Sequence, residues 1–340
     1  MSERIIGIDI GTSAIRVLMG EVDEAGKINV VARGQAESQG VRKGTIVDLE
    51  KCARAVQRAV EEAEHMVSAP INHALVGVGG TSVKGVSARG MIAITARDRR
   101  ISEEDKRRVE EQARAIVLPS DYEILHTLPR SYTVDSIEGI DEPLEMIGSR
   151  LEAEVHVISA SANALQSLQT VVNRAGVTVE DRVLDVLAAA EATAHEDERD
   201  MGVAVLDLGA GTAKIALFEN KALSFVAVQG YGADYFIKDL SIGCKTSAQN
   251  AERLLKRHGC ALASLIQDDE TVEVEGVQGR KPQIFARKYL ADILQPRAEE
   301  ILTLLRDDVK SAGLEKAFPA GVILTGGRSE ERRVGKECRL

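Results

Sequence analysis

Two short segments, IDIGTSAIRVL at residues 8–18 and LDLGAGTAKIAL at residues 206–217, constrain the fold more than any other feature of this chain. Each contains an apolar run that ends in Asp, a turn of glycine, small and hydroxyl residues, and a second apolar run. This pattern predicts a β-hairpin whose glycine-rich turn leaves backbone N–H groups free to bind an anion. Because the pattern recurs about 200 residues later, we expect two similar halves that hold one nucleotide between them.

The turns also carry side chains suited to phosphate and to a cation. Thr12, Ser13 and Thr212 add hydroxyl donors, and the glycines let a phosphate approach the main chain. Asp9 and Asp207 end the two apolar runs, where carboxylates suit a Mg²⁺ ion that keeps most of its water ligands. The sequence therefore predicts phosphate and hydrated Mg²⁺ at these turns.

The repeat extends beyond the turns. Three apolar runs between residues 4 and 34 predict a meander of antiparallel strands, and three runs between residues 203 and 230 predict a second. A helix is expected at about 49–67, with Asp48 as its N-cap. Near the end, AGVILTGG predicts a buried strand that stops at Gly326 and Gly327, a third place where backbone could approach a ligand.

Between the repeats, residues 82–162 predict a separate subdomain. We expect strands at 83–88, 91–95, 123–128, 131–134 and 151–160, and a charged helix at about 101–116 opened by Ser102 and Asp105. The preceding GVGGTSVKG is not a P-loop, because its hydroxyl residues come before Lys84. After the second meander we expect helices at 233–242 and 247–258, and a long helix at 282–312.

Composition excludes several classes of protein. A net charge of −10 with 3% aromatic residues disfavours a general nucleic-acid binder. Four cysteines without paired CxxC spacing, and no signal peptide, predict reduced thiols in a cytosolic protein. No run approaches the roughly 20 apolar residues of a membrane-spanning helix.

Duplicated meanders with Asp-Gly-hydroxyl turns and a late Gly-Gly strand resemble the superfamily of actin, sugar kinases and heat-shock chaperone ATPases. Within it, the chain is similar to the FtsA family of actin-like bacterial cell-division proteins. The similarity covers about residues 4–327 and is carried by GIDIGTSAIRVLMGEV, SQGVRKGTIVDLE, RHGCALASLI with DDETVEVEGVQGR, and AGVILTGG. RHGCAL followed by DETVEV is the most specific part, because nucleotide binding does not require it.

This resemblance implies an α/β, actin-like (ribonuclease H-like) duplicated fold, with two halves around a nucleotide cleft and a family-specific inserted subdomain. Residues 1–81 and 163–200 are expected to form the first half (1A), 82–162 the inserted subdomain (1C), 201–232 and 300–327 the second half (2A), and 233–299 a partner-binding subdomain (2B). Residues 328–340 depart from the family, whose members continue to an amphipathic helix that binds the membrane. Here RSEERRVGKECRL has no apolar face and resembles a vector-derived tail.

The resemblance also implies an ATP site. Gly11, Thr12 and Ser13 would form the first phosphate loop with Arg16 near the phosphates, and Gly209, Ala210, Gly211 and Thr212 the second. Asp9 and Asp207 would face Mg²⁺ through water, and Glu252, Lys256, Gly326 and Gly327 would lie near the adenosine. Ala210 replaces a usual third glycine, and its Cβ could crowd the phosphate. Glu252 and Lys256 stand at E-x-x-x-K where E-x-x-K is common.

The implied function is an ATP-binding adaptor that self-assembles into actin-like filaments, with no catalytic residue assigned and at most slow ATP hydrolysis. It would link the ring of the tubulin-like protein FtsZ to the cytoplasmic face of the inner membrane at the division site, and recruit later division proteins. A basic set that could hold the FtsZ C-terminal peptide, or could simply be solvated helix charges, comprises Arg280, Lys281, Arg287, Lys288 and Arg297.

Two alternatives remain open from the sequence. A phosphotransferase of the sugar kinase branch would need a catalytic Asp placed to deprotonate a substrate hydroxyl, and no substrate-specific motif is present. An actin-like pilus-assembly protein would share the cleft but bind other partners.

Overall fold

The first predicted meander forms three neighbouring strands of a five-stranded sheet, from its middle to one edge, in the computed structural model, which describes residues 4–277 and 281–327. Strands β1 (Arg4–Ile10), β2 (Ala14–Val22) and β3 (Ile28–Glu37) are antiparallel neighbours. β1 also pairs in parallel with β6 (His73–Val78), which pairs in parallel with β11 (Thr178–Leu184). The order is β11-β6-β1-β2-β3.

The second meander repeats this arrangement. Strands β12 (Val203–Leu208), β13 (Ala213–Glu219) and β14 (Ala222–Gln229) are antiparallel neighbours, and β17 (Val322–Thr325) pairs in parallel with β12 as β6 does with β1. The order is β14-β13-β12-β17. The predicted duplication is therefore confirmed, and it includes the parallel fourth strand.

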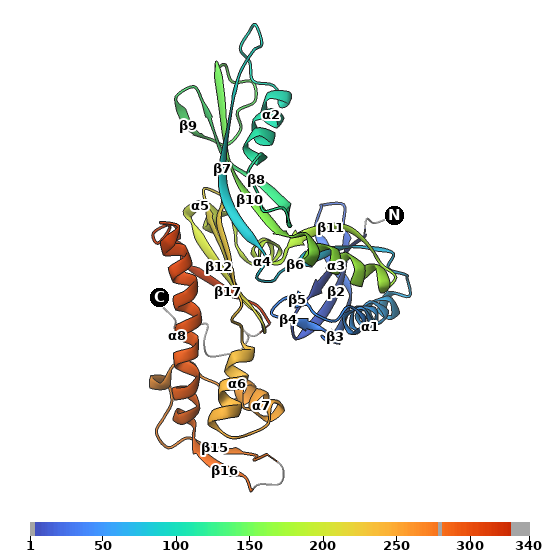
Figure 1. The fold of residues 1–340 in the computed structure, drawn as a ribbon, viewed down its shortest axis with the longest axis vertical. Coiled ribbons are helices and arrows are strands. Elements are labelled where there is room, and N and C mark those ends of the chain that lie inside the picture. Colours follow the sequence, from blue (N-terminus) through green and yellow to red (C-terminus); the bar gives the residue numbers. More distant parts are fainter. Residues whose placement is uncertain (1–3, 278–280, 328–340) are drawn as a thin grey trace.

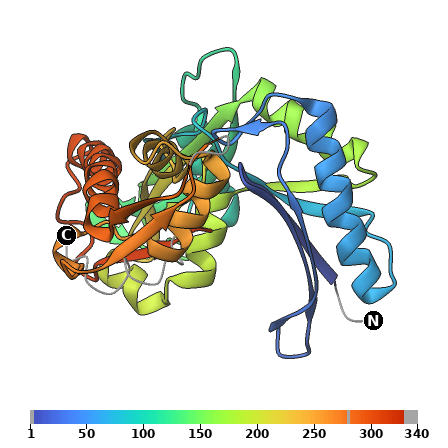
Figure 2. The ribbon, with the colours of Figure 1, turned by 90° about the horizontal axis from the view of Figure 1, so that it is seen from below.

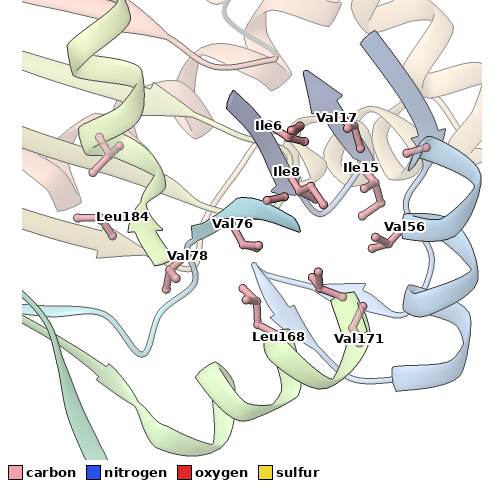
Figure 3. Close-up of a cluster of buried hydrophobic side chains, with 14 of the residues drawn as sticks. Ile6, Ile8, Ile15, Val17, Val56, Val76, Val78, Leu168, Val171 and Leu184 are labelled. Carbon is pink, nitrogen blue, oxygen red and sulfur yellow. The ribbon is translucent and has the colours of Figure 1, made fainter. Parts of the chain in front are cut away.

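Helices cover the first sheet and join it to the second. Helix α1 (Leu49–Val67) packs against β2 and β3, and its predicted N-cap is confirmed, because the Asp48 side chain accepts a hydrogen bond of 3.0 Å from the Lys51 N–H. Helix α3 (Ala162–Arg174) packs against α1, and Figure 3 shows the apolar side chains enclosed between these helices and the sheet. Helix α4 (Asp185–Thr193) contacts β12 and β13, so one apolar core extends from the first sheet into the second.

Residues between β6 and α3 form a projecting sheet, at the top of Figure 1. Its strands are β7 (Lys84–Ala93), β8 (Tyr122–Val134), β9 (Ile137–Ile140) and β10 (Arg150–Ser161), in the order β7-β10-β8-β9. Helix α2 (Glu103–Arg114) covers one face, and the predicted capping box of Ser102 and Asp105 is confirmed.

Two predicted breaks in this sheet are wrong. The segments 83–88 and 91–95 form the single strand β7, and 123–128 and 131–134 form the single strand β8. Gly90 pairs with Ala153 inside the ladder, and a Cβ there would lie 2.4 Å from the Val109 carbonyl oxygen of α2. Gly90 therefore allows a helix to approach and does not make a turn. Pro129 is accommodated beside Val155, where β8 and β10 shift register.

The remaining residues form a lower part, at the bottom of Figure 1, and the long helix beside the second sheet. They comprise α6 (Asp234–Gly243), α7 (Ala248–His258), the 3₁₀ turn η1 (Ala263–Leu265), β15 (Thr271–Val274), β16 (Gln283–Ala286) and α8 (Arg287–Ser311). The prediction of a helix from residue 282 is wrong, because residues 283–286 pair with β15 as a strand and the helix begins at Arg287.

Three short elements complete the chain: β4 (Val41–Arg42), β5 (Thr45–Ile46) and α5 (Glu196–Met201). Figure 2 shows the first sheet with α1 on one side of the molecule and the second sheet with α8 on the other. No helix within residues 4–277 and 281–327 is both long enough and apolar enough to cross a bilayer.

Candidate functional site

The two glycine-rich turns have the same local geometry. The Gly11 N–H donates to the Ala14 carbonyl at 3.1 Å, and the Gly209 N–H donates to the Thr212 carbonyl at 2.9 Å. Each turn follows a strand that ends near an Asp and precedes a strand that carries a cation. The hairpins predicted from the sequence are thus present in both halves.

The turns face each other at very short range. A Cβ added to Gly211 would lie 2.5 Å from Oγ1 of Thr12 and 2.9 Å from Cα of Lys43. Ala210, beside it, has a buried side chain, and its carbonyl accepts a hydrogen bond from the Asp234 N–H at the start of α6. Gly211 therefore lies between the two halves at a point where there is no room for a side chain.

A third segment, the turn between β4 and β5, lies against both loops. The Gly44 N–H donates to Oγ1 of Thr12 at 3.0 Å. The Nζ of Lys43 lies 5.4 Å from the ring centroids of both Tyr231 and Tyr235, at the far end of β14 and the start of α6. Sequence reasoning did not assign this turn to the site, although the Lys-Gly pair after an apolar run is a turn signal.

Five charged side chains, which we call the cleft floor, lie behind the turns: Asp9, Arg16, Asp185, Asp207 and Lys214. Asp9 is opposite Arg16 in the β1–β2 hairpin, and Asp207 is opposite Lys214 in the β12–β13 hairpin. Nη1 of Arg16 is 3.1 Å from Oδ2 of Asp9, and Nζ of Lys214 is 2.8 Å from Oδ2 of Asp207. The same carboxylate–cation pair is therefore made twice.

Lys214 has a second partner, which sequence reasoning missed. Its Nζ lies 2.6 Å from Oδ2 of Asp185, the first residue of α4. Burial raises the pKa of Asp185 to about 6, although the Lys214 ammonium opposes this shift. Burial alone would lower the pKa of Lys214, but the Asp185 and Asp207 carboxylates outweigh it and raise that pKa. A usable signal was the single Lys in AKIALFE, since a buried ammonium requires partners.

The late glycines lie beside the cleft floor. A Cβ on Gly327 would be 2.8 Å from Nη2 of Arg16, and one on Gly326 would be 2.6 Å from Oδ1 of Asp207. Glu252 and Lys256 lie on α7 and pair with each other at 2.9 Å. A contact of these four residues with adenosine stays a prediction.

The cleft floor fits a hydrated Mg²⁺ on one side. The Asp9 side chain is 47% exposed and can accept hydrogen bonds from metal-bound water, whereas Asp207 is 13% exposed with one oxygen on Lys214. Over the described ranges, no group of three or more His, Cys, Asp or Glu residues is arranged to ligate a metal directly. Asp9 is therefore the better placed of the two predicted carboxylates.

The predicted basic partner set does not form one accessible patch. Arg287 is buried, where its guanidinium pairs with Glu270 and donates to the His258 carbonyl at 3.1 Å. Arg297 pairs with Asp239 at 2.6 Å. Both arginines hold the subdomain together, so their prediction as peptide ligands loses support.

Two lysines of the set are accessible, and Arg280 lies outside the described residues. Lys281 is exposed, and Lys288 is half exposed while it pairs with Asp268 at 2.9 Å. Beside them Ile284 is 75% exposed, and the rings of Phe285 and Tyr289 stack with centroids 5.4 Å apart.

Comparison with known proteins assigns the chain to a family. A family model described as "Cell division protein FtsA" matches residues 204–332, and one described as "SHS2 domain inserted in FTSA" matches residues 80–159. The chain is 39% identical to the cell division protein FtsA of Pseudomonas aeruginosa over 326 residues, which cover 96% of this chain and 78% of that protein. The chain belongs to the FtsA family. FtsA of Bacillus subtilis and of Escherichia coli K12 are 35% and 32% identical, over 74% and 79% of their lengths.

Solved structures show that this FtsA-family chain has an actin-like fold, as the sequence predicted. The PilM-PilN type IV pilus biogenesis complex includes a chain that superposes with a TM-score of 0.67 at 16% identity, covering 96% of this chain and 82% of that one. MreB5 of Spiroplasma citri bound to ADP gives a TM-score of 0.54 at 12% identity, covering 96% and 85%. At these identities the likeness establishes a shared fold only.

Proposed function

We propose that this FtsA-family chain is an ATP-binding, self-assembling adaptor of cell division. It binds the C-terminal peptide of FtsZ and recruits later division proteins, and in the full-length protein a C-terminal amphipathic helix, which this sequence does not contain, links the FtsZ ring to the cytoplasmic membrane. The observation that carries the nucleotide part is the pair of matching turns, which face each other above a duplicated Asp–cation pair. An MreB structure with the same fold contains ADP.

In this proposal each half contributes the same parts to the nucleotide. Backbone N–H groups of residues 12–13 and 210–212 hold the phosphates, because glycine-rich turns present several donors to one anion. Arg16, whose side chain is 42% exposed, adds positive charge beside them. Mg²⁺, held through water at Asp9, would neutralise phosphate charge. Closure of the halves around ATP favours the polymerising conformation.

Nucleotide binding is tested with Gly11→Val and Gly209→Val. Added Cβ atoms would lie 2.9 Å from the Ala14 carbonyl oxygen and 3.2 Å from the Thr212 carbonyl oxygen, so both turns must change shape. We expect each variant to lose at least about tenfold in ATP affinity, because the converging N–H groups are displaced. Gly7→Val is the control, since no atom lies within 4 Å of its Cβ position. Unchanged ATP affinity in both turn variants would refute the proposed site.

The peptide surface that the structure supports comprises Lys281, Lys288, Ile284 and Tyr289. Short peptides are held by an apolar anchor beside a few cations, and these four side chains are accessible just before β16, on β16 and in the first turn of α8. Changing Arg287 would test this poorly, because loss of its buried pair with Glu270 would disturb the subdomain itself.

The test is titration of the FtsZ C-terminal peptide into Lys288→Glu and Ile284→Asp proteins. We expect affinity to fall at least about tenfold in each, as for residues at the centre of an interface. Lys310→Glu is the matched control, because Lys310 is exposed near the other end of α8. Equal affinity in all three variants would remove this surface from the peptide site.

Self-assembly is tested by sedimentation with ATP or ADP, with and without FtsZ. We expect more pelleted protein with ATP than with ADP, because only the closed form is polymerisation-competent in this proposal. The Gly11→Val protein should pellet equally with either nucleotide. Sedimentation of the wild-type protein that does not depend on nucleotide would separate assembly from the cleft.

A further inference from the structure

In each half, one cationic side chain of the cleft floor extends to a residue of the other half. Arg16, on β2 of the first sheet, lies against Gly327, which follows β17 of the second. Lys214, on β13 of the second sheet, reaches Asp185, which follows β11 of the first. The two crossings differ in exposure, since the Arg16 side chain is 42% exposed and that of Lys214 is 8% exposed.

The buried contact between Lys214 and Asp185 depends on a glycine in the neighbouring backbone. A Cβ on Gly79, just after β6, would lie 2.2 Å from Oδ2 of Asp185, so only glycine leaves room for this carboxylate. Asp185 and Asp207 both contact the Lys214 ammonium, at 2.6 and 2.8 Å. A buried ammonium with two carboxylates is favourable only when the geometry is held closely.

We propose that Lys214 is a positioning residue of the nucleotide site: held by Asp185, its ammonium orients Asp207 and reduces the need for Mg²⁺ when phosphate binds. The inference rests on the nucleotide binding proposed above. Without the ammonium, Asp207 would repel phosphate oxygens that approach the second turn, and a divalent cation would have to compensate. Lys214 acts through Asp207 and not by touching the phosphate.

The test separates this role from a role in folding. Lys214→Met alone leaves a buried carboxylate unpaired and is expected to destabilise the protein, so the main variant is Lys214→Met with Asp185→Leu, in which both members of the buried pair become apolar. The matched control is Lys221→Met with Glu196→Leu, which removes a surface pair of 2.8 Å that also joins a residue of the second half to one of the first. ADP affinity is measured for each protein with Mg²⁺ and with EDTA.

We expect the ratio of ADP affinity in Mg²⁺ to that in EDTA to rise at least about tenfold in the Lys214–Asp185 variant. The interaction between two unit charges a few ångströms apart in a weakly screening site corresponds to more than about a tenfold change in affinity. The ratio should be unchanged in the control. If Lys214 only stabilised the fold, both affinities would fall together. An unchanged ratio in the Lys214–Asp185 variant therefore overturns the inference.

A second measurement needs no nucleotide. Mg²⁺ should raise the thermal unfolding midpoint of the Lys214–Asp185 variant more than that of the wild type or the control, because Asp207 has lost its internal cation. Equal responses in all three proteins would contradict the inference. If the wild type binds no ADP in either buffer, the proposed nucleotide site fails, while this Mg²⁺ response still tests the charge supplied by Lys214.

Discussion

Gly211 is the residue at which the two halves approach most closely through their turns. A methyl group there would overlap Oγ1 of Thr12 and the backbone of Lys43, so Gly211→Ala should hold the halves apart. We expect weaker ATP binding and a lower unfolding midpoint, with a cost of about 1–3 kcal/mol, as for overpacked positions. Calorimetry and ATP titration measure both effects.

Gly7→Ala is the control for this change, because its Cβ position has no neighbour within 4 Å. If the Gly211→Ala protein matched the Gly7→Ala protein in both ATP affinity and unfolding midpoint, the turns would not be in contact in solution.

His156 should make stability depend on pH. It is 1% exposed where β10 passes β14, and burial, with the charge of Arg130, lowers its pKa to about 4. The unfolded chain takes up a proton below about pH 6.5 that the folded imidazole resists, so stability falls as pH decreases from about 6.5 towards 4, by up to about 1.4 kcal/mol per pH unit.

The measurement is chemical denaturation between pH 7 and 4.5. His156→Gln should fall less steeply than the wild type over this range, and His65→Gln, at an exposed position on α1, should follow the wild type. If the free energy of unfolding changed with pH in the same way in all three proteins, His156 would be excluded as the source of the pH dependence.

At the residue scale, the sequence predicted the parts of the site that lie next to each other in the chain. Asp9 with Gly11, and Asp207 with Gly209, are short motifs, so the amino-acid order alone was enough to locate both turns. Asp185, Lys43 and Gly79 join the site only because β6, β11 and the β4–β5 turn meet the second sheet. Sequence spacing contains no record of such contacts. For the same reason, nothing in the sequence distinguished the buried Arg287 from the exposed Lys288.

At the element scale, predictions succeeded where the chain carries a local signal. The meanders, α1 and the capping box of α2 follow from alternation, periodicity and caps. Predictions failed where an element depends on a distant partner. β16 is a strand because β15 pairs with it. Likewise, β7 continues through Gly90 because β10 pairs with β7 on both sides of that residue.

The cap of α2 allows a test at this scale. Ser102→Ala removes the hydroxyl that accepts from the Asp105 N–H and donates to the Asp105 carboxylate, while the hydrogen bond from the Ser102 N–H to that carboxylate remains. We expect the first turn of α2 to lose about 1 kcal/mol of local stability, as for other N-caps. Amide hydrogen exchange in α2 measures it.

Glu111→Gln, on an exposed position of the same helix, is the control for the cap. Protection of residues 103–106 in the Ser102→Ala protein that equals protection in this control would show that the cap contributes nothing.

At the scale of the whole molecule, the halves are joined at the turns, at the cleft floor and through Lys43. The Lys43 ammonium lies over two tyrosine rings of the second half. Lys43→Met should therefore speed the release of bound nucleotide by about two- to fivefold, the amount expected from loss of a cation–π contact. Stopped-flow displacement of a fluorescent ATP analogue gives the rate.

Arg42→Met is the control for this change, since Arg42 is the exposed neighbour in the same short hairpin. Equal release rates in the two variants would mean that Lys43 does not hold the halves together.

Strand β10 would have a mechanical consequence for the assembly proposed above. Leu151 to Val157 belong to the core of the projecting sheet, while Ile158 and Ala160 of the same strand belong to the core beneath the first sheet. A twelve-residue strand is about 40 Å long, so turning its base by about 10° would displace its far end by about 7 Å. The strand is in effect a lever arm. A small change of angle at the cleft would become, at the tip of the projecting sheet, a movement large enough to make or break a contact with a neighbouring molecule.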